Sequence, residues 1–190
     1  MPQFRPLDLE GVIEVIPDRF GDERGFFSEV YNAREWKANG IEVDFVQDNQ
    51  SLSSRVGVVR ALHFQLPPFA QAKLVRVTRG RVFDVAVDIR KGSPDFGRWV
   101  GIELSAEKWN QLFVPAGFAH GFVTLEPDTE LCYKVSAFYS GEHDRSIRFD
   151  DPAIGVDWPI GAGDAILSAK DAAAPLLADI DTGFVFGETG

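Results

Sequence analysis

GVVRALHFQLPPFAQAKLVRVTRGRVFDVAVDIR (57–90) is the stretch of sequence that decides the fold. It contains three runs rich in β-branched residues, GVVRALHFQ (57–65), KLVRVT (73–78) and RVFDVAVDIR (81–90), and the last two meet at Gly80. Such runs are typical of strands, and a glycine between two of them is typical of a hairpin. The stretch therefore predicts consecutive strands with no helix between them.

The same pattern extends on both sides of this stretch. Further strands are predicted over 11–16, 45–51, 98–104, 110–115, 120–125 and 130–138. Helical signal is confined to the ends of the chain: Asn32 is the expected cap of AREWKANG (33–40), and SAKDAAAPLL (168–177) predicts a short turn before Pro175. Because βαβ alternation and a glycine-rich phosphate loop are missing, we expect an all-β sandwich or barrel with short peripheral helices.

Length, composition and charge limit the possible functions. At 190 residues and 45% hydrophobic content, the chain is long enough for one substantial core, so we expect a single domain over 1–190. A net charge of −10 argues against nucleic acid and anionic membranes as partners. The sequence shows neither a membrane-length apolar run nor a secretory signal, which predicts a cytoplasmic location. The single cysteine, Cys132, is expected to be a buried, inert thiol.

The three histidines differ in their sequence context. His63 lies near the end of a strand in RALHFQ, His120 follows a turn in PAGFAHG, and His143 lies in the polar run SGEHDRS, where we expect a solvated loop residue. From its residue type alone, His63 is as readily a structural histidine of a strand as a catalytic one.

The positions of Gly57, Gly80 and His120 resemble the two motifs of the cupin superfamily, which has a jelly-roll barrel fold. In its metal-dependent members, two histidines two residues apart, a glutamate and a later histidine bind the ion. Here Gln65 replaces the second histidine and Lys73 stands in the place of the glutamate. An ammonium group cannot ligate a cation, so no metal is expected, whereas its charge can stabilise an oxyanion.

Eight segments along the chain resemble, in order, the dTDP-4-dehydrorhamnose 3,5-epimerase family. They are FGDERGFFSEVYN (20–32), FVQDNQS (45–51), VVRALHFQ (58–65), QAKLVRV (71–77), VFDVAVDIRKGSPDFGRWVG (82–101), VPAGFAHGFVTL (114–125), YKVSAFYS (133–140) and LSAKDAAAPLL (167–177). The resemblance implies a cupin-type jelly roll whose substrate is a dTDP-linked 4-keto-6-deoxy sugar of dTDP-rhamnose biosynthesis. Carbons 3 and 5 would be inverted through an enolate, without a cofactor.

The resemblance also implies roles for individual residues. His63 would be the base, Asp171 the carboxylate that orients its imidazole, and Tyr133 the proton donor. Lys73, with His63 and Arg60 nearby, would hold the enolate oxygen. Two alternatives stay open from the residues themselves. Tyr133 could be a packed strand aromatic, and Asp171 could cap a terminal turn.

Substrate binding by the same resemblance falls to a larger set of mostly polar residues. They are Arg24, Phe27, Glu29, Gln47, Asp48, Asn49, Arg60, Lys73, His120, Tyr139, Asp144 and Lys170, of which Phe27 and Tyr139 are candidates for stacking on the base. Two positions depart from the family pattern: Phe138 stands where a tyrosine is expected, and Asp144 where a glutamate is usual. The shorter side chain weakens the assignment of Asp144.

Three other functions compete with the double epimerisation. They are epimerisation at carbon 3 or carbon 5 alone, binding of a nucleotide sugar without catalysis, and a metal-dependent oxygenase. Gln65 and Lys73 argue against the oxygenase, and a binding protein needs neither a base nor an acid. We also expect a homodimer, because a small jelly roll leaves strand edges to cover and the run 25–27 beside Arg24 is suited to reaching a neighbouring subunit.

Overall fold

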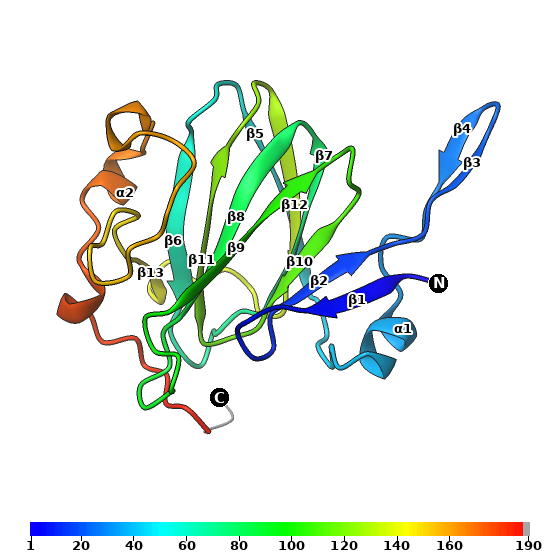
Figure 1. Cartoon of the computed structure of the whole chain (residues 1–190). Helices are drawn as coiled ribbons and strands as arrows, with labels where there is room; N and C mark the ends of the chain where they lie inside the picture. Colours follow the sequence, from blue (N-terminus) through cyan, green and yellow to red (C-terminus); the bar gives the residue numbers. More distant parts are fainter. Residues whose placement is uncertain (188–190) are drawn as a thin grey trace.

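The computed structural model describes residues 1–187 and contains two facing antiparallel sheets that form a jelly-roll barrel (Figure 1). The larger sheet has the strand order β1-β2-β10-β7-β12-β5, and the smaller one has the order β13-β6-β11-β8-β9. Their bounds are β1 Gln3–Pro6, β2 Ile13–Ile16, β5 Gln47–Ser53, β6 Val59–Gln65, β7 Lys73–Arg79, β8 Arg81–Asp88, β9 Trp99–Ser105, β10 Gln111–Val114, β11 Phe118–Thr124, β12 Thr129–Val135 and β13 Asp144–Ser146. The expected all-β, cupin-type jelly roll is confirmed.

Each strand predicted from the sequence is present, with shifted ends. The largest difference is at β12, which ends at Val135 and not at residue 138, because the chain then leaves the sheet and Ser136 bonds to Ala72. Of the strands in the two barrel sheets, β1 and β13 were not predicted, because QFRP has no run of β-branched or aromatic residues and DRS has no apolar residue at all.

Two short helices lie outside the barrel, as expected. α1 (Ala33–Ala38) is capped by Asn32, whose side-chain oxygen accepts a hydrogen bond from the Arg34 amide at 3.1 Å. α2 (Ala169–Ala172) is capped by Ser168, and short 3₁₀ turns at Ala162–Asp164 and Leu177–Asp179 flank it. None of the helices formed by residues 1–187 is both long enough and apolar enough to span a membrane.

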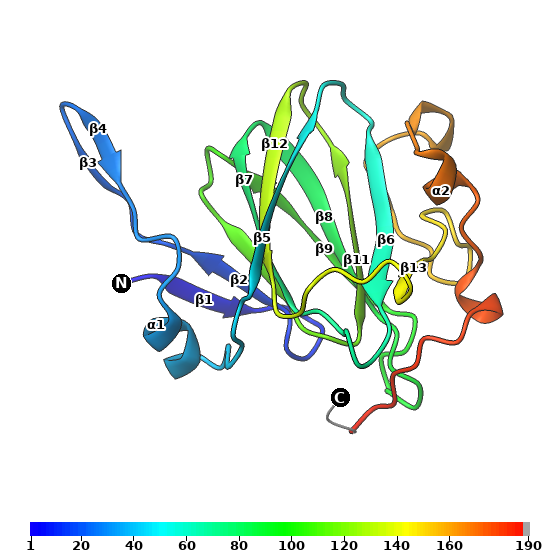
Figure 2. The same cartoon turned by 180° about the vertical axis from the view of Figure 1, so that it is seen from behind.

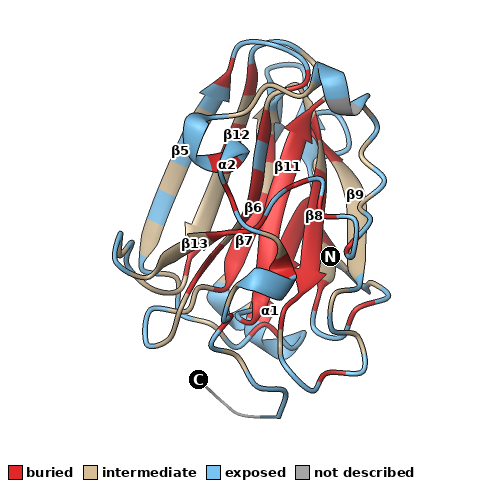
Figure 3. Ribbon diagram, turned by 90° about the vertical axis from the view of Figure 1, so that its left-hand side faces the viewer, coloured by how far each residue is buried: buried red, intermediate tan, exposed pale blue. Residues whose placement is uncertain are grey.

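Alternation along the strands separates two layers of apolar packing. One set faces the barrel interior and includes Val75, Val82, Leu112 and Phe122. The other lies on the outer face of the smaller sheet, where the C-terminal region from Ile147 onward covers it. Figure 3 shows that β11 in the middle of this sheet is buried along its length and its neighbour β8 along most of its length. Polar side chains inside the barrel are therefore exceptions that require a reason.

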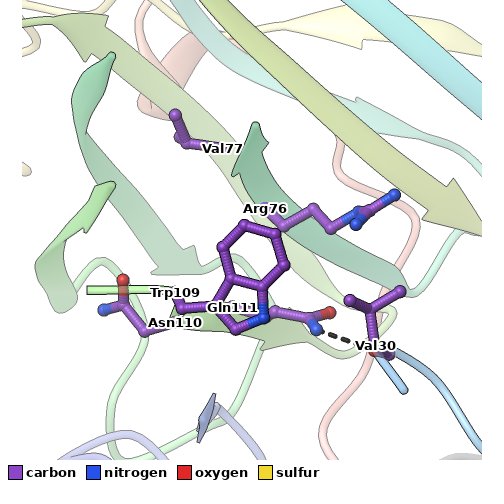
Figure 4. Close-up of a pocket in the computed structure, with 6 residues that line it drawn as sticks. All are labelled: Val30, Arg76, Val77, Trp109, Asn110 and Gln111. Carbon is purple, nitrogen blue, oxygen red and sulfur yellow. Dashed lines mark hydrogen bonds between the residues drawn. The ribbon is translucent and has the colours of Figure 1, made fainter. Parts of the chain in front are cut away.

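A hairpin of β3 (Phe20–Asp22) and β4 (Gly25–Phe27) forms an arm that projects from the barrel on the side opposite α2 (Figures 1 and 2). Its root is fixed to the larger sheet, since the Trp109 indole donates to Ser28 Oγ at 2.9 Å and Gln111 Nε2 donates to the Val30 carbonyl at 2.7 Å (Figure 4). The cavity beneath the root measures only about 10 Å³, which is room for one water.

Candidate active site

His63 and Asp171 form a close pair between β6 and α2. Nε2 of His63 lies 2.6 Å from Oδ1 of Asp171, and the side chains are 32% and 5% exposed. Because an ionised carboxylate only accepts hydrogen bonds, Nε2 carries the proton and Nδ1 keeps a free electron pair. α2 is capped by Ser168, whose Oγ accepts from the Asp171 amide at 3.1 Å. The Asp171 carboxylate is thus engaged with His63 and does not cap the helix.

The charge of Asp171 is maintained by its neighbours. Burial on its own raises the pKa of this carboxyl group, but the hydrogen bond and charge of His63, the hydrogen bond of Ser168 and the charge of Lys170 outweigh it and lower the pKa. Asp171 therefore stays ionised, and it can compensate the positive charge that the imidazole acquires when it accepts a proton.

A cleft of about 280 Å³ opens beside this pair, between β6 and the segment 166–171. Arg60, His63, Lys170 and Asp171 are among the residues that line it. The Val58–Ile166 bridge joins the two walls at one end. Four residues that the sequence proposed for one site, separated by more than a hundred positions along the chain, thus meet at one cleft.

Tyr133 and Lys73 face His63 from the opposite sheet. Tyr133 on β12 pairs with Val75 on β7, and Lys73 pairs with Val135, so both side chains belong to the inner face. Nζ of Lys73 crosses the barrel and donates to the His63 carbonyl at 3.2 Å. The barrel thus has a base candidate on one wall and an acid candidate with a cation on the other.

Burial changes the acidity of both groups on this wall. It lowers the pKa of Lys73 to about 8, although the negative charges of Asp144 and Asp84 oppose the change. It raises the pKa of Tyr133, an effect that Arg60 opposes and Asp144 reinforces. Near neutral pH, Lys73 is therefore still mainly an ammonium group, and Tyr133 is a protonated phenol able to give a proton.

His120 makes a second, more deeply buried pair with Asp84 of β8. Nε2 of His120 lies 2.8 Å from Oδ1 of Asp84, and both residues are buried. His120 is also the direct cross-strand neighbour of His63. Sequence reasoning missed Asp84. The available signal was a charged residue at an inward position of the apolar run RVFDVAVD, but nothing in the sequence named its partner.

At the rim of the barrel, a polar network joins four further candidates. Asp144 forms an ion pair with Lys170 and accepts a hydrogen bond from the Tyr139 hydroxyl at 3.2 Å. Gln47 accepts from the Tyr139 amide at 3.0 Å and donates to Asn49 at 2.9 Å. The aspartate at position 144 is therefore long enough to reach both Lys170 and Tyr139.

Gln65 shows why its position is unsuited to metal binding. Its Nε2 donates to the carbonyls of Phe69 and Phe138, and its Oε1 accepts from the Ser140 amide at 2.7 Å. The side chain thus fixes two loops. Within the described residues there is also no group of three or more His, Cys, Asp or Glu that could hold a metal ion.

The structure does not bring every candidate to the cleft of its own chain. Arg24 and Phe27 lie on the arm, with 85% of the Arg24 side chain and 70% of Phe27 exposed. Glu29 accepts a hydrogen bond from Asn32 just after the arm. Asp48 points to the outer face of β5 and pairs with Lys134 at 2.8 Å, because neighbouring strand residues alternate between faces.

Two minor expectations need correction. His143 is not simply a solvated loop residue: it is half-buried, its Nδ1 lies 2.8 Å from Ser140 Oγ, and its ring packs against Phe69. Cys132 is half-buried and not fully buried. Side chains alternate along β12, and Cys132, next to the inward-facing Tyr133, points away from the barrel interior.

Comparisons with known proteins agree with one another. A family model described as dTDP-4-dehydrorhamnose 3,5-epimerase matches residues 6–179. The dTDP-4-dehydrorhamnose 3,5-epimerase of Sinorhizobium fredii is 54% identical over 183 residues, covering 96% of this chain and 93% of that protein. The Legionella pneumophila dTDP-6-deoxy-D-glucose-3,5-epimerase, solved in complex with dTDP-4-keto-L-rhamnose, has a TM-score of 0.91 and 46% identity, covering 95% of each chain. The Bacillus anthracis enzyme, solved with TDP and PPi bound, has a TM-score of 0.89 and 44% identity, covering 93% of this chain and 99% of that one.

Proposed function

Because the chain belongs to the dTDP-4-dehydrorhamnose 3,5-epimerase family, we propose that its own barrel residues carry out the two inversions that convert dTDP-4-dehydro-6-deoxy-D-glucose to dTDP-4-dehydro-L-rhamnose. The protein is an isomerase that acts on a nucleotide sugar. The observation that supports these residue roles best is the placement of His63 and Tyr133 on opposite inner walls, since inversion requires that a proton leaves one face of the carbon and returns to the other.

In the proposed mechanism, Nδ1 of His63 takes the proton from the carbon next to the ketone. The electron pair of the broken C–H bond moves into an enolate, and negative charge develops on the ketone oxygen. The Lys73 ammonium, with Arg60 at the cleft, stabilises that charge. The Tyr133 hydroxyl then returns a proton from the opposite face and becomes a phenolate. Before the second carbon reacts, His63 releases its proton to solvent and the Tyr133 phenolate takes one up, so that the same sequence at the second carbon completes the reaction. Proton transfer of this kind requires no redox cofactor.

Binding of the nucleotide sugar is proposed to use the polar rim and the cleft. Arg60, His120 and Lys170 are positive or hydrogen-bonding groups that can meet the sugar and its phosphates, while Tyr139 at the rim offers an aromatic face to the base. Concentrating cations here offsets the overall charge of −10, which otherwise repels a dianionic diphosphate.

The assembly is proposed to be a homodimer in which the arm of one subunit reaches the partner. A two-stranded hairpin is marginally stable in water, yet this arm exposes Phe20, Phe26 and Phe27 with 62%, 54% and 70% of their surface accessible. A partner surface would cover these rings and bring Arg24 to a site that it does not reach in its own chain. We further propose one cupin-like domain over 1–190 and a cytoplasmic location.

The function is tested by incubation with dTDP-4-keto-6-deoxyglucose in deuterated water, followed by mass and NMR analysis of the product. We expect one deuterium at carbon 3 and one at carbon 5, with both centres inverted. Exchange at one carbon only would assign a mono-epimerase, and binding without exchange would assign a non-catalytic protein. Either result would contradict the proposed reaction.

A further inference from the structure

Asp84 is a buried carboxylate to which the mechanism above gives no role. Its exposed fraction is 0%, and one oxygen is bonded to His120 at 2.8 Å. Its second oxygen, Oδ2, is buried and has no hydrogen-bond partner within residues 1–187. A buried carboxylate with a free oxygen is costly unless nearby positive charge compensates it, so its presence suggests a role other than stability.

The register of the smaller sheet places Asp84 close to the pair of His63 and His120, on the same inner face. Asp84 is opposite Phe122 on β11, and His120, two residues earlier on the same face, is opposite His63 on β6. Lys73 reaches this region from the other sheet, because its Nζ bonds to the His63 carbonyl. The Asp84 charge acts on Lys73 as well, since it raises the Lys73 pKa against the effect of burial.

The hydrogen bond to Asp84 decides what His120 can do. Since the carboxylate accepts, Nε2 of His120 carries a proton, and Nδ1 is the ring nitrogen left for a bound molecule. In the neutral ring Nδ1 can only accept a hydrogen bond, which does not help a ketone oxygen. In the imidazolium ion both ring nitrogens carry a proton, so that Nδ1 donates to the ketone oxygen while Nε2 stays bonded to Asp84.

We propose that Asp84 is a positioning residue for the ketone oxygen, acting through His120 and Lys73; the inference rests on the proposed epimerase function. Asp84 holds the His120 ring by Nε2, and its charge favours the ammonium form of Lys73. When His63 removes the proton from carbon, the negative charge on oxygen meets the His120 Nδ1–H and the Lys73 ammonium in fixed positions.

Asp84→Asn tests this role, because the change keeps the shape and removes the charge. We expect kcat to fall at least about tenfold with KM within about threefold, since the lost interaction belongs to the enolate. The alkaline limb of the pH profile should move to lower pH, because Lys73 loses an attractive charge. The melting temperature can fall, because a buried charge that compensates Lys73 disappears, so kcat is expressed per folded protein.

Several charged groups near Lys73 affect its pKa, and therefore the position of the alkaline limb. Across the barrel from Lys73, the titratable or charged groups are Arg60 and His63 on β6, Asp84 on β8, His120 on β11 and Asp144 on β13. Tyr133 lies beside Lys73 on the neighbouring strand β12. Of these, Asp84 and Asp144 raise the Lys73 pKa. Asp144→Asn should therefore move the same limb, but without the dependence on His120 described below.

Asp88→Asn is the matched control. Asp88 is also 0% exposed and lies on the same face of β8, but its carboxylate bonds to Arg90 at 2.7 Å and to Ser93 at 2.6 Å. It therefore holds a turn and faces no candidate catalytic group. We expect a lower melting temperature here too, but with kcat of the folded protein and the pH limb unchanged, which distinguishes this variant from Asp84→Asn.

A double-mutant cycle with His120→Asn completes the test. If Asp84 acts through His120, Asp84→Asn should cost at least about threefold less in kcat when His120 is already replaced. Native kcat in Asp84→Asn, a loss that only follows the folded fraction, or an equal loss in both backgrounds would overturn the inference. Deuterium exchange by the unsubstituted chain is measured alongside, so that failure of the epimerase function itself is recognised separately.

Discussion

At the scale of single residues, the site combines what sequence can show with what only folding reveals. His63 and Asp171 are 108 positions apart, so no local pattern joins them, and family resemblance alone predicted the pair. Lys73 was recognisable because an ammonium replaces an expected ligand. Asp84 was not, because the identity of the partner of a buried carboxylate depends on sheet register, which the sequence does not state.

The proposed acid and base should separate in two assays. His63→Ala should lose both solvent deuterium exchange and product, because no enolate forms without the base. Tyr133→Phe keeps the ring and its packing but removes the phenolic proton, so exchange should continue through His63 while inverted product falls by about 10² or more. The two rates are measured on the same samples by NMR. A Tyr133→Phe protein that inverts carbon 5 at the native rate would make Tyr133 a packing residue.

Lys73 should set the alkaline limit of catalysis. Its pKa is lowered to about 8, so the ammonium is lost as pH rises through that value, and kcat/KM should fall with it. Tyr133 does not account for this limb, because its pKa is raised. Lys73→Met should reduce kcat by about 10² or more with little change in KM, and the residual activity should show no limb near pH 8. A variant in which only KM rises would assign Lys73 to ground-state binding.

At the scale of elements, patterns of period two predicted most of the barrel strands but missed the short strands of the arm and of the rim, and they did not predict which residue caps the helix of Asp171. The nine predicted strands lie in runs with several β-branched or aromatic residues, whereas β3, β4 and β13 have three residues each and show no period. The helix caps were only partly readable: Asn32 caps α1 as predicted, but Ser168, one turn before Asp171, caps α2.

Gly57 links β6 to the segment that carries Asp171, and it should not tolerate a side chain. Its φ is +82°, and an added Cβ would lie 2.7 Å from the Asp164 carbonyl oxygen. Gly92 is the control, because its φ of +80° imposes the same strain but no atom lies within 4 Å of an added Cβ. We expect Gly92→Ala to cost about 1–2 kcal/mol of stability. Gly57→Ala should cost more and, unlike Gly92→Ala, lower kcat, as measured by denaturant unfolding and steady-state kinetics.

At the scale of the whole molecule, the barrel buries most of its apolar side chains within the chain, whereas the arm leaves its phenylalanines exposed. The barrel buries its apolar faces against each other and against the C-terminal region. The arm instead presents exposed phenylalanines and Arg24 to solvent, although the sequence resemblance placed Arg24, Phe27 and Glu29 among the binding residues. The proposed second subunit would resolve this discrepancy, because the arm could then complete a site other than its own.

Complementation between two defective chains tests this arrangement. One chain carries Arg24→Ala and Phe27→Ala on the arm, and the other carries His63→Ala in the barrel; each homodimer should be nearly inactive. In the mixed dimer, purified through two different tags, one site receives an intact arm from the His63→Ala chain and an intact base from the other chain. That dimer should therefore recover about half of native activity.

Phe96→Ala serves as the control, because Phe96 is an exposed aromatic residue outside the arm, at 43% accessibility, and its loss should not affect activity. If the mixed dimer is no more active than its parents, or if the native protein is a fully active monomer in light scattering, the arm does not act across the interface, and its residues must be removed from the binding site.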